Sequence, residues 1–274
     1  MKHFLIYTNR HKDKNMVFTE RIRSYLETKG QRVSVKTQGV DWKDAADCII
    51  VLGGDGTVLQ AARETRQLNI PIIGVNLGTL GYMTEIEPAN LEESLDRLIR
   101  GDYEQESRMM LYGRVFRSGG GTEEGWALND IVISRKGSLR IIRFNIYVNG
   151  QFLNDYSADG MIVTTPTGST GYNLSAGGPL VEPQARLIVL TPICPHTLNQ
   201  RSIILSPEDV IEIEIPRGGD GREQAVEASF DGSHSVPLCT DEKIRIVQSE
   251  RMTEFLRLNQ VSFLEVLHRK LYEG

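Results

Sequence analysis

The stretch VLGGDGTVLQ, residues 51–60, places three glycines and one aspartate between an apolar run and a helix-like segment. The residues that lead into it, Cys48–Leu52, are continuously apolar, which is typical of a strand buried on both faces. Glycine weakens the interior of strands and helices, so three glycines at this junction indicate a tight turn. In open α/β sheets, turns that follow the carboxyl ends of strands form the ligand crevice.

Strand and helix patterns alternate around this stretch through the first hundred residues. The patterns predict strands at 3–8, 32–37, 48–54 and 70–76, and helices at 16–30, 57–69 and 90–101. Such alternation predicts a Rossmann-like parallel sheet with helices on its faces. We therefore expect an α/β nucleotide-binding domain over residues 1–103.

Short strand patterns replace the helical ones from residue 104 to residue 250. Asn149-Gly150 lies between two alternating runs, which is a strong hairpin signal, and Asp231-Gly232 offers a second hairpin turn. Ser118–Gly125 indicates a flexible hairpin tip. These patterns predict an all-β, sandwich-like C-terminal domain over 104–250. Residues 251–274 are expected to form a helical segment that packs back on the N-terminal domain.

Composition and charge exclude several classes of protein. The net charge of −5 over 274 residues gives no basic surface for nucleic acid. No apolar run reaches the roughly 18 residues of a membrane span, and the N-terminal run is too short for a signal peptide. The three widely spaced cysteines fit reduced thiols and no zinc pattern. We expect a cytoplasmic protein with no metal site of its own.

Asp55 is the unusual member of the glycine-rich turn. Glycines and the first amides of the following helix suit phosphate oxygens, whereas a carboxylate repels them. Asp55 could accept a proton from an attacking hydroxyl or help to hold a divalent cation. By itself the stretch fits a glycine-rich turn with Asp55 as helix N-cap equally well. Neither GxxxxGK[ST] nor GxGxxG is present.

Two further segments carry polar groups that suit a ligand. Residues 159–180 combine hydroxyls, glycines and one aromatic residue, Tyr172, in one long run. Such a run suits phosphates, sugar hydroxyls and a flat ring. Asn129 and Asp130 interrupt an otherwise alternating strand pattern, which is compatible with a bulge or a ligand site at a strand end.

The order GGDGT, ND and TPTGSTGYNLSAGGP resembles the NAD kinases over nearly the whole chain. The GGDG element alone is shared with diacylglycerol kinases, sphingosine kinases and phosphofructokinases, whereas the third segment is much more specific. The resemblance implies the NAD kinase-type fold, with NAD lying between the two domains. It also implies that ATP phosphorylates the 2′-hydroxyl of the adenosine ribose of NAD.

The resemblance assigns roles residue by residue. Asp55 matches the aspartate that acts as proton acceptor, and Asn129 matches the asparagine of an Asn-Glu pair that binds the adenosine part. Asp130 stands where glutamate is commoner. The loop that meets the phosphates corresponds to Gly54, Gly56 and Thr57.

The remaining candidate residues belong to the second half of the chain. Asp159 matches an aspartate near the amide and adenine groups of the ligand. The segment that wraps the adenosine and the adjacent ribose corresponds to Thr170, Gly171, Tyr172, Asn173, Leu174 and Ser175, with Gly171 where alanine is frequent. The other matched positions are Arg140 as a ligand contact, Ser157 in place of a basic residue near the phosphates, and His234 after the Asp-Gly turn.

The same resemblance implies partners and alternatives. ATP would bring Mg²⁺ bound to its phosphates, and the chain would form a homo-oligomer, a dimer or a tetramer. Two other functions stay open at this point: a lipid kinase of the diacylglycerol or sphingosine type, and a dinucleotide sensor without catalysis.

Overall fold

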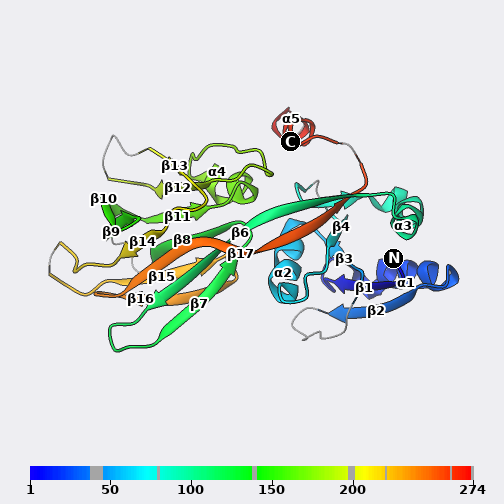
Figure 1. Ribbon diagram of the computed structural model, residues 1–274, viewed down its shortest axis with the longest axis horizontal. Helices are drawn as coiled ribbons and strands as arrows, with labels where there is room; N and C mark the ends of the chain where they lie inside the picture. Colours follow the sequence, from blue (N-terminus) through cyan, green and yellow to red (C-terminus); the bar gives the residue numbers. More distant parts are fainter. Residues whose placement is uncertain are drawn as a thin grey trace. The chain divides into compact units, whose positions relative to one another are not determined.

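The strands and helices predicted for the first hundred residues are all present in the computed structural model (Figure 1). The structure describes residues 1–37, 46–78, 81–137, 141–196, 201–219, 221–259 and 261–272. They form two compact units, which we call unit 1 (Met1–Arg108 and Thr253–Gly274) and unit 2 (Met109–Met252).

Unit 1 is built on a parallel sheet with the strand order β2-β1-β3-β4. The bounds of its strands are β1 His3–Thr8, β2 Arg32–Thr37, β3 Cys48–Gly53, β4 Ile72–Asn76 and the short β5 Thr84–Ile86. β5 pairs parallel with β4 and was not predicted from the sequence. The residues of β1 and β3 are all buried, as the continuous apolar runs require.

The helices of unit 1, except the C-terminal one, pack against this sheet. Their bounds are α1 Val17–Thr28, α2 Asp55–Thr65, α3 Leu91–Arg100 and α5 Phe263–Tyr272, with single turns of 3₁₀ helix at Lys14–Met16 and Pro88–Asn90. α1 and α3 contact each other, and their leucines and isoleucines share one core with Phe4 and Ile6 of β1. α2 packs on β3 and β4. Because side chains alternate along a strand, Leu5 and Tyr7 point to the opposite face from Phe4 and Ile6.

Two long strands have residues in both units: β6 (Glu104–Phe116) and β17 (Lys243–Arg257). Residues 251–257 therefore continue β17, and the terminal helix begins only at Phe263. In unit 1, Arg257 makes ion pairs with the buried carboxylates of Glu85, at 3.0 Å, and Glu106, at 3.5 Å. Removing one partner of such a buried pair is strongly destabilising, so this network holds the end of β17 in unit 1.

Unit 2 has the predicted sandwich-like character. One sheet has the order β13-β12-β11-β8-β15-β16 and is antiparallel throughout. The other sheet of unit 2 has the strand order β10-β9-β14-β17 and also contains the pair β6 and β7. The bounds are β7 Thr122–Ala127, β8 Asp130–Arg135, β9 Ile142–Val148, β10 Gln151–Ala158, β11 Gly160–Thr164, β12 Ile188–Ile193, β13 Ile203–Leu205, β14 Ile211–Glu214, β15 Ala225–Phe230 and β16 His234–Cys239.

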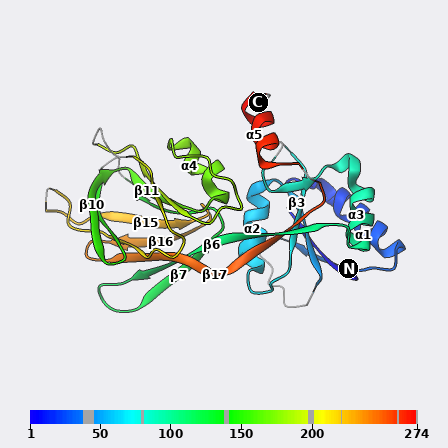
Figure 2. The same ribbon diagram turned by 45° about the horizontal axis from the view of Figure 1, so that its top comes forward.

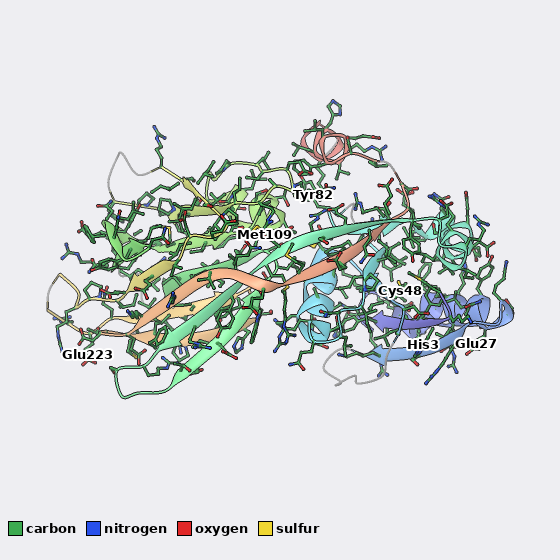
Figure 3. The ribbon with its side chains drawn as sticks, viewed as in Figure 1. His3, Glu27, Cys48, Tyr82, Met109 and Glu223 are labelled. Atoms are coloured by element: carbon green, nitrogen blue, oxygen red, sulfur yellow. The ribbon has the colours of Figure 1, made fainter. Side chains whose placement is uncertain are left out.

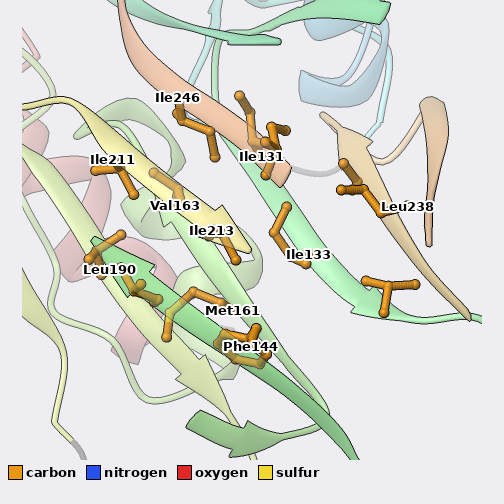
Figure 4. Close-up of a cluster of buried hydrophobic side chains, with 14 of the residues drawn as sticks. Ile131, Ile133, Phe144, Met161, Val163, Leu190, Ile211, Ile213, Leu238 and Ile246 are labelled. Carbon is orange, nitrogen blue, oxygen red and sulfur yellow. The ribbon is translucent and has the colours of Figure 1, made fainter. Parts of the chain in front are cut away.

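Buried side chains from both sides fill the core of unit 2 (Figure 4). Ile131 and Ile133 of β8 and Met161 of β11 meet Phe144 of β9 and Ile213 of β14 there. The two predicted hairpin turns are confirmed. Asn149-Gly150 joins β9 to β10 as a two-residue turn, and Asp231-Gly232 begins the three-residue turn 231–233 that joins β15 to β16. The angle φ is positive at all four of these residues, as in a type I′ turn.

A short helical segment interrupts the β-structure of unit 2. The 3₁₀ helix Thr167–Thr170 and the one-turn helix α4, Tyr172–Ser175, follow directly after β11 (Figure 2). In the part of the chain that the structure describes, no helix is long and apolar enough to cross a membrane.

Candidate active site

Asp55 lies at the topological switch point of the unit 1 sheet. β1 is flanked by β2 on one side and by β3 on the other, so the crevice for a ligand is expected at the carboxyl ends of β1 and β3. Gly53 ends β3, and Asp55 is the first residue of α2. Asn9, which follows β1, donates from Nδ2 to Thr57 Oγ1 at 3.2 Å and so links the two strand ends.

The helix-cap alternative for Asp55 is wrong. The N-cap of α2 is Gly54, in an extended conformation, and no side chain caps this helix. The carboxylate of Asp55 instead accepts two backbone N–H groups from the segment after β4: Tyr82 donates to Oδ2 at 2.8 Å and Met83 donates to Oδ1 at 3.0 Å. We call Gly81, Tyr82 and Met83 the Asp55 cradle. Tyr82 is labelled in Figure 3.

The glycines around Asp55 have different tasks. A Cβ at Gly53 would lie 2.3 Å from Thr57 Oγ1, so this glycine allows the turn to close on Thr57. A Cβ at Gly54 or Gly56 would meet no atom within 4 Å. The backbone at these two glycines therefore borders open space beside the first turn of α2, where helix N–H groups can receive phosphate oxygens.

The Asp55 cradle is backed by the C-terminal helix of the same unit. The ring of Tyr82 lies 6.1 Å from that of Phe263, and Lys270 Nζ lies 4.4 Å from the centre of the Tyr82 ring. An aromatic pair together with a cation over the ring face restrains Tyr82. α5 thereby helps to fix the backbone amide that holds Asp55.

Replacing Gly81 by alanine should displace the Asp55 carboxylate. The added Cβ would lie 2.1 Å from Asp55 Oδ1 and 2.8 Å from Thr84 Oγ1, so the carboxylate or the backbone must move. A catalytic group misplaced by about 1 Å can lose about a hundredfold in rate, so we expect kcat to fall at least about tenfold. Gly78→Ala is the matched control, because it is in the same segment but its new Cβ has no atom of the described residues within 4 Å. Equal kcat for both variants, measured at saturating substrates, would mean that the cradle does not position Asp55.

In unit 2, Asn129 and Asp130 lie at the start of β8, where the turn between β15 and β16 meets them. The carboxylate of Asp231 accepts the backbone N–H groups of Leu128, Asn129 and Asp130. Asn129 Oδ1 is buried and has no hydrogen-bond partner among the described residues. A buried acceptor without a partner is costly, and a donor on a bound ligand would satisfy it.

Asp130 is buried in this arrangement, with 6% of its surface exposed. Burial, and next the negative charge of Asp231, raise the pKa of Asp130 to about 7. Strongly raised pKa values of this kind are concentrated at functional sites. Asp130 therefore changes charge near neutral pH.

The segment after β11 lies against Asn129. A Cβ at Gly168 would lie 2.4 Å from the carbonyl oxygen of Asn129, and one at Gly171 would lie 3.4 Å from Asn129 Nδ2. Asn173 is fully buried: its Nδ2 donates to the carbonyl oxygen of Pro179 at 2.9 Å, and its Oδ1 accepts from Thr191 Oγ1 at 2.7 Å. This asparagine therefore locks the segment from inside.

The other predicted residues of this segment face outward. Tyr172 and Leu174 are 47% and 38% exposed, and Ser175 is exposed as well. Thr170 is half-buried and bonds to the carbonyl oxygen of Thr167 at 3.4 Å. His234, the first residue of β16, is exposed and lies with its ring 5.7 Å from that of Phe230. Asn129, Asp130, this segment and the turn before His234 thus gather at one end of the six-stranded sheet.

Asp159 lies toward the opposite end of that sheet, and Ser157 lies on β10 of the other sheet. Asp130 pairs with Thr164 in the register of β8 and β11, whereas Ser134 pairs with Gly160. The two ends are separated by about 13–16 Å, at roughly 3.3 Å per strand residue. Asp159 makes an ion pair with Arg135 at 3.4 Å, and Ser157 accepts the backbone N–H of His196 through its carbonyl oxygen. Arg140 lies outside the described residues.

Sequence reasoning missed three groups that the structure places at these residues. They are the amides of Tyr82 and Met83, the carboxylate of Asp231, and Arg135 beside Asp159. The Gly78 and Gly81 pair after the strand 70–76 was an available signal for the first group. The sequence marks Asp231 only as a turn residue.

Comparisons with known proteins agree over the full chain. The family model described as the ATP-NAD kinase N-terminal domain matches residues 6–103, and the ATP-NAD kinase C-terminal domain matches residues 128–258. An NAD kinase of Lachnospira eligens is 47% identical in an alignment that covers 99% of this chain and 100% of that protein. An NAD kinase of Thermoanaerobacter sp. is 39% identical in an alignment that covers the whole of both proteins.

Two solved structures have the same fold. Yeast NADH kinase complexed with NADH has a TM-score of 0.85 at 24% identity, over 99% of this chain and 87% of that one. An NAD kinase from Archaeoglobus fulgidus in complex with ATP has a TM-score of 0.75 at 26% identity, over 98% of both chains. With its two matched domains and its full-length relatives, this chain belongs to the NAD kinase family.

Proposed function

We propose that Asp55 is the proton acceptor when this chain transfers a phosphoryl group from ATP to the 2′-hydroxyl of the adenosine ribose of NAD. The observation that carries this proposal is the held carboxylate at the switch point of the unit 1 sheet. Each oxygen of Asp55 accepts one backbone N–H. A carboxylate oxygen has two lone-pair sites, so each oxygen keeps one with which to accept a hydroxyl proton.

The proton transfer is late in this mechanism. A sugar hydroxyl is a much weaker acid than a carboxylic acid, so Asp55 does not remove the proton before the phosphoryl group approaches. In a loose phosphoryl-transfer transition state the hydroxyl becomes acidic as its oxygen bonds to phosphorus. A positioned carboxylate that then takes the proton contributes roughly 10²–10⁴-fold.

The donor substrate is ATP with its bound Mg²⁺, and the metal ion is part of that substrate. Among the described residues, no group of three or more His, Cys, Asp or Glu side chains is arranged to hold a metal ion. Mg²⁺ usually keeps several waters and binds substrate phosphates rather than an all-protein cage. The open space beside Gly54 and Gly56, at the first turn of α2, is where we propose that the phosphates bind.

Asn129 and Asp130 are the proposed contacts to the adenosine part of NAD. The unsatisfied Asn129 Oδ1 can accept from a ligand amine or hydroxyl, and ionised Asp130 can do so more strongly. Thr170–Ser175 would wrap the adenosine, with the exposed ring of Tyr172 as an apolar face. The inward-facing Asn173 would keep this segment in place.

We also propose a homo-oligomer, a dimer or a tetramer, working in the cytoplasm, where NAD and ATP are available. Unit 2 exposes large apolar side chains on β10, which is an edge strand: Phe152 is 58% and Leu153 36% exposed. Apolar side chains on an exposed edge strand are typical of association surfaces.

An acceptor panel tests this function against its alternatives. With MgATP, the chain should convert NAD to NADP, as followed by an NADP-specific dehydrogenase, and should leave diacylglycerol and sphingosine unmodified. Phosphorylated lipid in place of NADP would show a lipid kinase. NAD or NADP binding without any ATP turnover would show a dinucleotide sensor.

A further inference from the structure

Three consecutive backbone amides donate to one carboxylate in unit 2. The N–H groups of Leu128 and Asn129 each donate to Asp231 at 2.8 Å, and that of Asp130 does so at 3.1 Å. The N–H of Asp231 donates back to the carbonyl oxygen of Asp130 at 3.0 Å. Hydrogen bonds to a charged acceptor are roughly twice as strong as neutral ones, so Asp231 holds these amides firmly.

The carbonyl oxygens of the same residues are held from the other side. Thr165 Oγ1 donates to the carbonyl oxygen of Leu128 at 2.6 Å. The carbonyl oxygen of Asn129 accepts from Thr165 N at 2.8 Å and from Thr164 Oγ1 at 3.0 Å. The backbone before β8 is therefore fixed along both edges, while Asn129 Oδ1 is left to find a partner outside the described residues.

From this geometry we infer that Asp231 is a positioning residue for the acceptor substrate: it fixes the Asn129–Asp130 backbone and makes NAD binding weaken as the pH falls. The inference rests on the proposed adenosine contacts of Asn129 and Asp130. Asp231 itself does not touch the ligand in this account. Its carboxylate is occupied by the backbone amides, and it acts through the two residues that it holds.

The pH dependence follows from the charges around Asp130. On the described elements packed there, the titratable groups are Asp231, on the turn, and His234, at the start of β16; β11 places the uncharged Thr164 opposite Asp130. Burial and the charge of Asp231 raise the pKa of Asp130 to about 7. Below that pH Asp130 becomes neutral, and its hydrogen bonds to ligand donors lose their charge assistance.

Calorimetric titration of the full chain with NAD, without ATP, over about pH 5.5–8.5 tests the inference. For the wild type, the dissociation constant should rise about fivefold to tenfold from pH 8 to pH 6, the difference between a charged and a neutral hydrogen bond. For Asp231→Asn, NAD binding should be weaker at pH 8. The pH at which the dissociation constant rises should be about one unit lower than in the wild type, because the negative charge that repels ionised Asp130 is gone. For Asp130→Asn, the dissociation constant for NAD should not rise as the pH falls.

Asp241→Asn is the control, because Asp241 is also a turn residue with positive φ (65°) but is exposed, whereas Asp231 is half-buried. It should bind NAD like the wild type at every pH. If Asn129→Ala and Asp130→Asn leave NAD affinity unchanged, the proposed adenosine contacts are wrong. If these two weaken binding while Asp231→Asn has the pH profile and affinity of the wild type, the role of Asp231 is wrong.

A second measurement keeps the inference testable should Asp231→Asn fail to fold. Carbon NMR of the wild-type aspartate carboxyl groups should show the Asp231 signal shifting with a midpoint near the pKa of Asp130, about 7. An Asp231 signal that stays constant through that midpoint would overturn the inference, because the two carboxyl groups would then not sense each other.

Discussion

Asp55→Asn is expected to lower kcat for NADP formation by about a hundredfold or more, with NAD affinity changed by less than about threefold. Asparagine keeps the size of the side chain and removes the oxygen that accepts the proton. The amide oxygen of asparagine can still accept one N–H of the Asp55 cradle, whereas its NH₂ group must face the other. The variant therefore also loosens Tyr82 or Met83, which adds to the loss.

The control for this variant is Asp102→Asn. Asp102 is exposed, lies in the same unit and pairs with Arg97 at 3.0 Å, and its replacement should leave kcat unchanged. Rates are to be measured at saturating NAD and MgATP, with NAD affinity measured separately. A kcat for Asp55→Asn within about fivefold of the wild type would contradict the assignment, because loss of a general base costs more than that.

Asp130→Asn is expected to stabilise the chain at pH 8 while weakening NAD binding. The pKa of Asp130 is raised from 3.8 to about 7 by burial and by Asp231, so the ionised form is costly to bury. Because the pKa of Asp130 is raised in the folded state, folding is favoured while Asp130 is protonated. This contribution of Asp130 to stability is fully present below about pH 3.8 and is lost as the pH rises through about 7. Each pKa unit corresponds to about 1.4 kcal/mol, so the variant should gain about 4 kcal/mol in unfolding free energy at pH 8.

Urea unfolding at about pH 8 and pH 4 checks this prediction. The variant should exceed the wild type in free energy of unfolding at pH 8 and be nearly equal to it at about pH 4. Asp47 is the opposite case, because backbone N–H groups of Lys2 and His3 lower its pKa. Asp47→Asn should therefore destabilise the chain at pH 8. An Asp130→Asn variant that is no more stable than the wild type at pH 8 would show that Asp130 is not a strained ionised group. Stability given up at a binding residue is a common trade-off with function.

Local patterns were enough to predict most of the fold. The apolar runs at β1, β3 and β4 and the periodic helices between them predicted a parallel sheet, because both patterns report burial directly. The two hairpin turns were predicted from Asn-Gly and Asp-Gly, whose residues tolerate the positive φ that such turns need. β5 has only three residues and was missed, since so short a strand carries almost no periodicity.

The partners of the site residues could not be predicted from these patterns. The Asp55 cradle forms because β3 and β4 are neighbours and their carboxyl ends lie side by side, which only the strand order decides. Asp231 reaches Leu128 through the register of β15 on β8, about a hundred residues apart in sequence. The register of β11 on β8 separates Asp159 from Asn129, although the family resemblance assigns both to one ligand.

The most direct test of the account uses NAD whose adenosine ribose lacks the 2′-hydroxyl, offered to the wild-type chain with MgATP. We expect this analogue to bind, to compete with NAD, and to yield no phosphorylated dinucleotide by mass spectrometry. The reason is that the hydroxyl facing Asp55 is the acceptor. A phosphorylated analogue would contradict the account, because the phosphoryl group would then have been transferred to a different hydroxyl.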